Sequence, residues 1–343
     1  MRASRWFQGL VPALLFAAPL TAWAQGELVV YCTVQEEWCR PMVAAFEKAT
    51  GIKVLMTRKS AGEFYAQIKA ESANPRGDIW WGGTGDPHLQ AAEEGLLEAY
   101  RSPKMAEQHD WAVRHYDAAK GRSIGIYAGA LGFSYNNDQL KKKNVPAPKC
   151  WSDLVQPAFK DEVQVANPNS SGTSYNMLAT FVQLFGEAKA FDFLKQLHKN
   201  INQYTKSGAA PARAVATGET LVGITFQHDA SVQVAGGAPV TIVSPCEGTG
   251  YEIGGMSIIK GAKNMDNAKK WYDWALSVDA QNIGPTTKVA YQVPSNKSAS
   301  PPPGAPKLSE IKLINYDFAK YGSSAERTRL LKKWDAEVST LPK

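Results

Sequence analysis

Short apolar segments alternate with longer amphipathic segments from residue 28 to residue 95. Continuous apolar runs of this kind are typical of buried parallel strands, and apolar positions three and four residues apart are typical of the helices that cover them. The expected strands lie at residues 28–31, 52–56 and 78–81. The expected helices lie at residues 42–50, 61–73 and 86–94. This alternation predicts the α/β class, with a parallel sheet covered by helices.

The same alternation continues towards the C-terminus. Further strands are expected at residues 163–165, 221–226 and 240–243, and further helices at residues 172–185, 209–217, 264–278 and 311–338. Two extended runs differ from the rest because they are long and contain glycines, namely Ile126–Tyr135 and Glu252–Ile259. They flank a central α/β block, which predicts that the chain crosses twice between two lobes.

The length of the chain agrees with two lobes, because 343 residues usually exceed one compact core. We expect residues 25–127 and 256–310 to form lobe 1 and residues 128–255 to form lobe 2. Residues 311–343 are expected to form a C-terminal helix, and the sequence leaves open which lobe carries it.

The first 24 residues have the pattern of a secretory signal peptide. Arg2 and Arg5 make its start positive, and the apolar run Leu10–Leu20 is short and contains prolines. The small-x-small sequence Ala22–Ala24 predicts cleavage before Gln25. An uncleaved membrane anchor is the alternative, but the apolar run is too short to span a bilayer. The sequence therefore predicts an exported, periplasmic protein.

The charge balance is mildly positive, at +6 for the whole sequence. Removal of the signal peptide takes away Arg2 and Arg5 and leaves about +4. Such a charge helps to attract anions. No lysine- or arginine-rich block with interleaved aromatic residues is present, so we expect no nucleic-acid partner. Lys141–Lys143 is interpreted as a solvated helix end.

Four cysteines remain after the signal peptide, and an even number in an exported chain predicts disulfides. Sequence alone allows three pairings. We expect Cys32 to pair with Cys39 and Cys150 with Cys246. No CxxC motif or neighbouring histidine pair has zinc-site spacing, so neither a metal nor a cofactor is expected.

Small polar residues follow three expected strands, where the N-termini of the next helices begin. These places are Ser60–Gly62, Thr84–Asp86 and Asn169–Ser174. Backbone N–H groups, hydroxyls and the positive end of a helix dipole suit a phosphate or a similar oxyanion. An ordinary N-cap is the alternative, but the six residues Asn169–Ser174 exceed what a cap needs. Such neutral donors can hold a dianion without a lysine or arginine.

A second group of polar residues follows the apolar strand at residues 221–226, where His228 and Asp229 lie, and Glu252 begins the second crossing. Asp229 as a helix cap and His228 as a buried structural histidine are the alternatives. No serine or cysteine nucleophile in a GxSxG-type turn accompanies them, so we expect no enzyme. The group suits sugar hydroxyls or an ammonium. Glu37 faces either the same cleft or solvent at a helix start.

The segments "GDIWWGGTGD" and "NPNSSGTSY", with the signal peptide and the two crossings, resemble the periplasmic solute-binding proteins of ABC importers. The similar branch is the type II two-lobed one, which includes ferric-ion, phosphonate and sugar-phosphate binders. The resemblance implies a periplasmic-binding-protein fold whose two β crossovers form the hinge. Ferric binders carry a tyrosine pair where this chain has Phe226–Asp229, which argues against iron.

Within that branch the chain resembles the hexose-phosphate binders most. The resemblance implies an anion end made of Ser60, Ala61, Gly62, Thr84, Ser171, Gly172, Thr173 and Ser207. It implies a sugar end made of His228, Asp229, Glu252 and Glu37. A 2-aminoethylphosphonate binder is the alternative, in which Asp229 and Glu252 hold the ammonium. The expected partners are a small phosphorylated solute and an inner-membrane permease, and a membrane sensor is compatible with either ligand. We expect a monomer.

Overall fold

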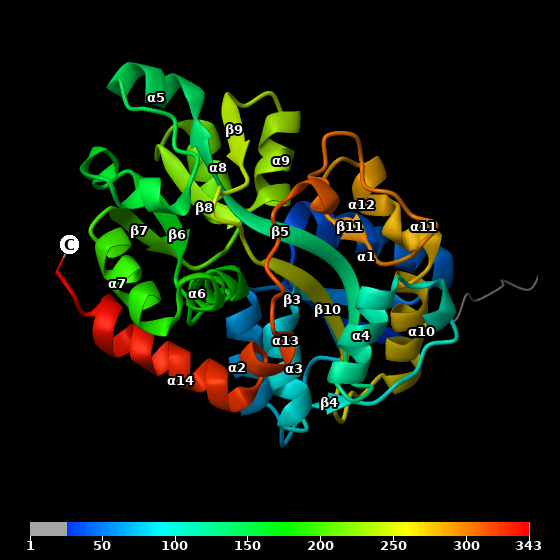
Figure 1. Cartoon of the computed structure of the whole chain (residues 1–343). Helices are drawn as coiled ribbons and strands as arrows, with labels where there is room; N and C mark the ends of the chain where they lie inside the picture. The colour runs from blue at the N-terminus through cyan, green and yellow to red at the C-terminus, as the bar shows by residue number, and fades with distance from the viewer. Residues whose placement is uncertain (1–25, 343) are drawn as a thin grey trace, which may run out of the picture.

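The computed structural model describes residues 26–342, in which helices cover a central sheet (Figure 1). The predicted signal peptide and its cleavage before Gln25 lie outside these residues. Within residues 26–342, no helix combines the length and the apolar character that crossing a membrane requires. The α/β class predicted from the sequence is confirmed.

The predicted start of the fold is also confirmed, because three parallel strands alternate with three helices. The strands are β1 (Glu27–Cys32), β2 (Lys53–Arg58) and β3 (Ile79–Thr84). The helices are α1 (Glu36–Thr50), α2 (Ala61–Ala70) and α3 (Gly85–Glu93). Helix α1 starts earlier than the periodicity predicted, although it contains Pro41. Gly51 ends it in the left-handed conformation, with φ of 72°, which a glycine adopts at little cost.

One long strand links the two parts of the sheet. The first part of β5 (Ile124–Asn136) pairs with β10 (Tyr251–Ile259) and β11 (Val293–Pro294). The last part of β5 pairs with β8 (Val222–Phe226) and β9 (Val240–Val243). The strands of the described residues therefore form one hydrogen-bonded sheet, and β5 runs across the middle of the molecule between two groups of elements (Figure 1).

The second group of elements repeats the α/β pattern. Its other parallel strands are β6 (Val163–Ala166) and β7 (Ile201–Thr205), and the path through the whole sheet is β2-β1-β3-β10-β5-β8-β6-β7. Its helices are α5 (Asn137–Lys143), α6 (Gly172–Phe185), α7 (Glu187–His198), α8 (Ala210–Thr217) and α9 (Gln227–Ala235). Lys141–Lys143 form the last turn of α5, and Asn144 ends it in the left-handed conformation.

Two main hydrophobic cores lie on either side of β5. The first core contains side chains of β1, β3, β10 and α1. Further elements add to it, namely β4 (Leu97–Glu98), α4 (Asp110–Ala118), α10 (Met265–Ala275), α11 (Val278–Gln281) and α12 (Ile283–Thr286). The second core is built by β6, β8, α6 and α7. We call the elements around these cores the first half and the second half.

The single helix predicted at residues 311–338 is wrong. Residues 311–317 are not helical, because Leu313 forms a β-bridge with Thr249 and Ile314 donates its N–H to the carbonyl oxygen of Thr249. Two α-helices follow, α13 (Phe318–Tyr321) and α14 (Ser324–Trp334), and the π-helix η5 (Asp335–Ser339) continues α14. The side chains of Leu330, Trp334 and Val338 enter the second core. Helix α14 therefore packs on the second half, and its N-terminal part also contacts α3 of the first half (Figure 1).

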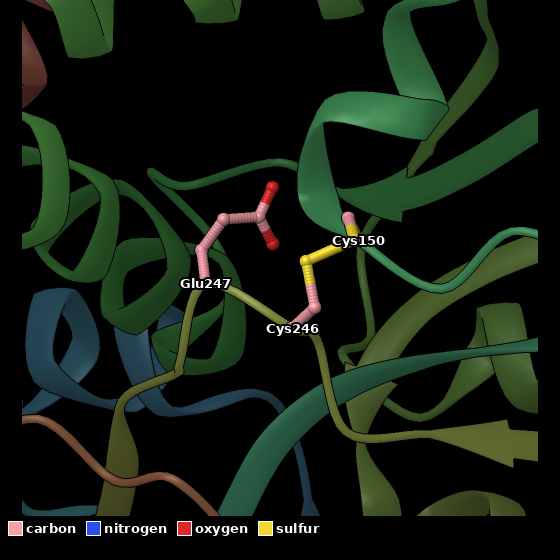
Figure 2. A group of neighbouring side chains, drawn as sticks. All are labelled: Cys150, Cys246 and Glu247. Carbon is pink, nitrogen blue, oxygen red and sulfur yellow. A yellow bond between two sulfur atoms is a disulfide. The ribbon is translucent and has the colours of Figure 1, made fainter.

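Both predicted disulfides are present, Cys32–Cys39 and Cys150–Cys246. Glu247 lies beside the Cys150–Cys246 disulfide, and its carboxylate is close to the sulfur atoms (Figure 2). Its two oxygens accept hydrogen bonds of 2.8 and 2.9 Å from the backbone N–H groups of Trp151 and Ser152. The disulfide and this carboxylate together attach the segment before β10 to the second half.

Candidate functional site

A cleft of about 430 Å³ not filled by protein atoms lies between the two halves. Its walls bring together ten of the residues that the sequence singled out, namely Ser60, Ala61, Thr84, Ser171, Gly172, Thr173, Ser207, His228, Asp229 and Glu252. These residues come from β3, β10 and four different helix starts or loops of both halves. Segments that are far apart in the sequence therefore meet in one cavity.

Three helix N-termini converge at one end of the cleft. Ser60 is the N-cap of α2 and forms a capping box with Glu63, Thr84 is the N-cap of α3, and Ser171 is the N-cap of α6. The first N–H groups of a helix have no acceptor within the helix and carry partial positive charge. This end of the cleft is therefore suited to an anion, as the sequence predicted.

Thr84 and Gly172 hold α3 and α6 in close contact at this end. A Cβ atom on Gly172 would lie 1.9 Å from the Thr84 hydroxyl oxygen, so only glycine fits there. The hydroxyl oxygen of Thr84 is buried and has no hydrogen-bond partner among the described residues. Thr173 and Ser171 also lie close together, since a Cβ atom on Gly208 would meet both of their hydroxyls. The hydroxyl groups of Thr84, Ser171 and Thr173 thus lie close together around the start of α6.

Arg58 also lines the cleft, although the sequence did not indicate it. Its Nε donates to the backbone oxygen of Val34 at 3.0 Å, and its Nη2 donates to the hydroxyl of Ser207 at 3.2 Å. Burial lowers the pKa of the guanidinium from its ordinary value of 12.5, and nearby carboxylates oppose that effect. The group is still a cation at neutral pH. The expectation that neutral donors alone form the anion end is therefore corrected.

The signal for Arg58 in the sequence is weak, because a charged residue at the end of a strand is usually solvated. The Arg58 side chain points into the cleft because it donates to the backbone oxygen of Val34, in the loop after β1. Val34 becomes a neighbour of Arg58 only when β1 and β2 pair.

His228, Asp229 and Glu252 form a second polar group in the wall of the cleft, and each side chain is at most 5% exposed. The Nε2 atom of His228 lies 3.8 Å from a carboxyl oxygen of Asp229 and 3.5 Å from one of Glu252. The Thr225 hydroxyl donates to Asp229 at 2.9 Å, and Gln35 donates its amide N–H to the other oxygen of Asp229. The three groups are therefore close enough to contact one small polar molecule together.

Burial controls the charges of this group. It lowers the pKa of His228 to about 3, so the imidazole is neutral at pH 7. It raises the pKa of Asp229 to about 7, an effect that the Thr225 hydrogen bond and the charges of Arg213 and Arg58 oppose. Burial, followed by the charge of Asp229, raises the pKa of Glu252 well above its usual value. A ligand that donates hydrogen bonds to the two carboxyl groups would favour their ionised forms.

Tyr127 and Gln292 also line the cleft and were not predicted. The ring centre of Tyr127 lies 6.4 Å from that of His228, and its hydroxyl oxygen accepts from the backbone N–H of Gly83 at 2.9 Å. The amide oxygen of Gln292 is buried without a hydrogen-bond partner among the described residues. Neither a tyrosine in a crossing strand nor a glutamine in a loop has a sequence pattern that indicates binding.

Two predicted site residues do not line the cleft. Gly62 lies behind its wall, where its N–H donates to the backbone oxygen of Ser170 at 3.1 Å. Glu37 lies at the outer lip, where its carboxylate accepts two hydrogen bonds of 2.9 and 2.8 Å from Arg213. Its side chain is 57% exposed, so solvent and Arg213 satisfy it rather than a bound molecule. The structure therefore favours the alternative, a solvated helix start, for Glu37.

Several contacts cross the mouth of the cleft and join the two halves. The hydroxyl of Ser60 donates to the backbone oxygen of Lys206 at 3.0 Å, in addition to the contacts Arg58–Ser207, Gly62–Ser170 and Glu37–Arg213. These contacts connect the starts of α1 and α2 and the end of β2 with α8 and with loops of the second half. The structure is thus a closed arrangement in which a bound molecule would be shielded from water.

Comparison with known proteins gives an independent view of this fold. Residues 84–321 match the family of bacterial extracellular solute-binding proteins. The periplasmic binding protein AfuA from Actinobacillus pleuropneumoniae, solved with exogenous fructose-6-phosphate bound, is 46% identical, with a TM-score of 0.88 over 92% of this chain and 100% of AfuA. The periplasmic binding protein P5PA is 41% identical, with a TM-score of 0.89 over 92% of this chain and 100% of P5PA.

A more distant relative is described as a binder of a different phosphorus compound. The putative 2-aminoethylphosphonate-binding periplasmic protein of Salmonella typhimurium is 26% identical over 302 residues, which cover 84% of this chain and 83% of that protein.

Proposed function

The chain belongs to the family of bacterial extracellular solute-binding proteins, the non-enzymatic capture components of ABC importers, and from that premise we propose that its solute is a hexose phosphate. The observation that carries the proposal is the chemical difference between the two ends of one cleft. Helix N-termini and Arg58 would form the anion end, and two carboxyl groups with a neutral imidazole would form the other.

The anion end supports a phosphate group as its occupant. Hydroxyls of Thr84, Ser171, Thr173 and Ser207 and the N-termini of α3 and α6 supply donors from several directions. The Arg58 guanidinium adds a formal positive charge and a planar set of N–H donors, which matches phosphate geometry. A dianion in this partly buried place interacts more strongly with these groups than it would in water.

The other end supports a sugar ring. A sugar hydroxyl is both a donor and an acceptor, so it can donate to Asp229 or Glu252 while it accepts from the N–H of neutral His228. Hydrogen bonds to charged groups contribute about 1.5–3 kcal/mol each. The similarity to AfuA, which has been solved with fructose-6-phosphate, supports the same ligand class.

A second candidate is 2-aminoethylphosphonate, and the pair Asp229 and Glu252 is the observation that favours it. An ammonium group would stabilise both carboxylates, and a relative at 26% identity is described as such a binder. We rank it second because an ammonium cannot accept a hydrogen bond from His228. A ferric ion ranks third, since Phe226–Asp229 contains no tyrosine where ferric binders carry a tyrosine pair.

The proposal also includes the organisation predicted from the sequence. Residues 25–127 with 256–310 and residues 128–255 would act as two lobes that move about the β crossovers and deliver the solute to a membrane permease. Cleavage before Gln25, a monomeric state and a contact with a membrane sensor remain predictions.

Calorimetric titration of the mature protein tests the ligand. Fructose 6-phosphate and glucose 6-phosphate are titrated beside 2-aminoethylphosphonate, inorganic phosphate and ferric citrate. We expect tight binding of at least one hexose phosphate and weaker binding of all three others. The matched variant Asp229→Ala should weaken hexose-phosphate binding at least tenfold and inorganic phosphate much less. Tight binding of 2-aminoethylphosphonate alone would establish the alternative, and equal loss of both anions in Asp229→Ala would refute two separate ends.

A further inference from the structure

A buried charged cluster lies next to the helix starts that line the cleft, and its own charged side chains are not part of the lining. Arg327 on α14 is 2% exposed, and its guanidinium carbon lies 4.0 Å from the ring centre of Tyr175. Asp86 on α3 is 1% exposed and accepts a hydrogen bond of 3.3 Å from the hydroxyl of Tyr316. Three helices from both halves therefore meet at this cluster, namely α3, α6 and α14.

The opposite charges of Asp86 and Arg327 make it favourable to bury the two groups near each other. A buried carboxylate or guanidinium without an opposite charge is strongly unfavourable. Burial raises the pKa of Asp86 to about 6, and the charge of Arg327 opposes that rise. One oxygen of Asp86 and Nη1 of Arg327 have no hydrogen-bond partner among the described residues. Burial lowers the pKa of Arg327, and Tyr175, followed by Asp86, opposes that effect. Removal of Arg327 would take away the positive charge that opposes the burial of Asp86.

The position of the cluster relates it to the anion end. Asp86 is two residues after Thr84, in the first turn of α3, and Tyr175 is two residues after Thr173, in the first turn of α6. The Tyr175 hydroxyl also donates to the backbone oxygen of Tyr321 at 2.5 Å, directly before α14. The same two helix starts that meet at the front of the site are therefore held from behind by the Arg327 side chain.

We propose that Arg327 is a positioning residue for the anion site. By attracting Asp86 and stacking on Tyr175, it sets the relative positions of the N-termini of α3 and α6 when the cleft is closed. It also places one more positive charge behind the helix ends that face the anion. This inference rests on the proposed function, because it assumes that an anion binds where these two helices begin.

A double-mutant cycle on ligand affinity tests this role. The variants are Arg327→Met, Asp86→Asn and both together, and fructose 6-phosphate is titrated by calorimetry well below the melting temperature of each. We expect each single variant to weaken binding at least tenfold, and the double variant to be no weaker than Arg327→Met alone. Arg329→Met is the matched control on the same helix, since its exposed guanidinium pairs with Glu187 and Glu326 away from the cleft.

A residue that only stabilises α14 would lower the melting temperature without this coupling. Wild-type affinity in Arg327→Met, or additive losses in the double variant, would therefore overturn the proposal. Arg327→Lys keeps the charge but not the planar stack, so it should recover part of the affinity that Arg327→Met loses.

Hydrogen exchange of the unliganded protein separates this proposal from the choice of ligand. If the wild-type protein binds no phosphate compound, the proposed function fails. The positioning role then predicts that Arg327→Met, unlike Arg329→Met, accelerates exchange mainly at residues 84–88 and 172–176. Acceleration spread evenly over the second core, or none at all, would overturn the role of Arg327 in either case.

Discussion

The substitution Gly172→Ala should disable ligand capture while leaving each half folded. A Cβ atom at this position would lie 1.9 Å from the hydroxyl oxygen of Thr84 and 3.0 Å from its Cβ. Gly172 belongs to α6 in the second half, and Thr84 ends β3 in the first half. The clash is therefore between the halves, and a small opening of the cleft relieves it.

The structure gives the size of the effect. Ordinary contact begins at 3.4 Å, so the two atoms must separate by about 1.5 Å. Thr84 is 2% exposed and has little space for another rotamer. Overpacking of this kind costs about 1–3 kcal/mol, and here that cost falls on the closed state alone. Since 1.4 kcal/mol corresponds to a tenfold change, affinity should fall by roughly 5- to 150-fold.

Calorimetry with fructose 6-phosphate measures this loss, and thermal unfolding of the unliganded protein shows whether folding is preserved. Gly236→Ala is the matched control, because this glycine ends α9 in the same half with φ of −77° and its nearest heavy atoms are 3.3 and 3.6 Å away. We expect the control to bind like the wild type. Wild-type affinity in Gly172→Ala would refute the conclusion that the ligand-bound state is closed at this contact.

Three further predictions follow from the same geometry. Thr173→Asp should abolish binding of phosphate ligands in calorimetry, because it places a carboxylate among the anion donors; unchanged affinity would remove this turn from the site. Burial raises the pKa of Asp229 to about 7, so its charge grows as pH rises, and affinity for fructose 6-phosphate should increase between about pH 6 and pH 8. In Asp229→Asn, only the increase in affinity that comes from ionisation of the ligand's own phosphate should remain. The same increase with pH as in the wild type would contradict the role of Asp229. Replacing Cys150 and Cys246 by serine should lower the free energy of unfolding by about 2–5 kcal/mol in urea titrations, since their bond closes a long loop; an unchanged midpoint would contradict it.

The sequence predicted the first half of the fold well because local signals agreed there. Apolar strands, helix caps such as Ser60 and a terminating Gly51 all indicated the same elements that the structure contains. The prediction of one helix at residues 311–338 was wrong for the opposite reason. Residues 311–317 have helical periodicity, but a β-bridge between Leu313 and Thr249 competes with the helix, and its partner is distant in sequence. Only the tertiary arrangement decides between the two.

The same distinction applies to the site. Residues that follow a strand and begin a helix, such as Thr84 and Gly172, were predictable because a parallel sheet brings these positions to one edge. Arg58, Tyr127 and Gln292 were not, since each reaches the cleft through a contact with a segment distant in sequence. Glu37 was misplaced for a related reason, because the opposing Arg213 on α8 is not visible from the local pattern.

Under the proposed function, the choice of ligand would depend on His228, Asp229 and Glu252 rather than on the anion end. Helix N-termini and Arg58 would hold a phosphate, a phosphonate or a phosphate ester with little distinction, because all present similar oxygens. At the other end, Asp229 and Glu252 are buried carboxyl groups whose pKa values are raised. Inorganic phosphate carries no sugar hydroxyls or ammonium to donate to these carboxyl groups, so under the proposed function it would leave their burial uncompensated. A solute that spans the cleft and donates hydrogen bonds to both carboxyl groups would compensate their burial. The resulting difference in binding free energy between this solute and inorganic phosphate would give the selectivity.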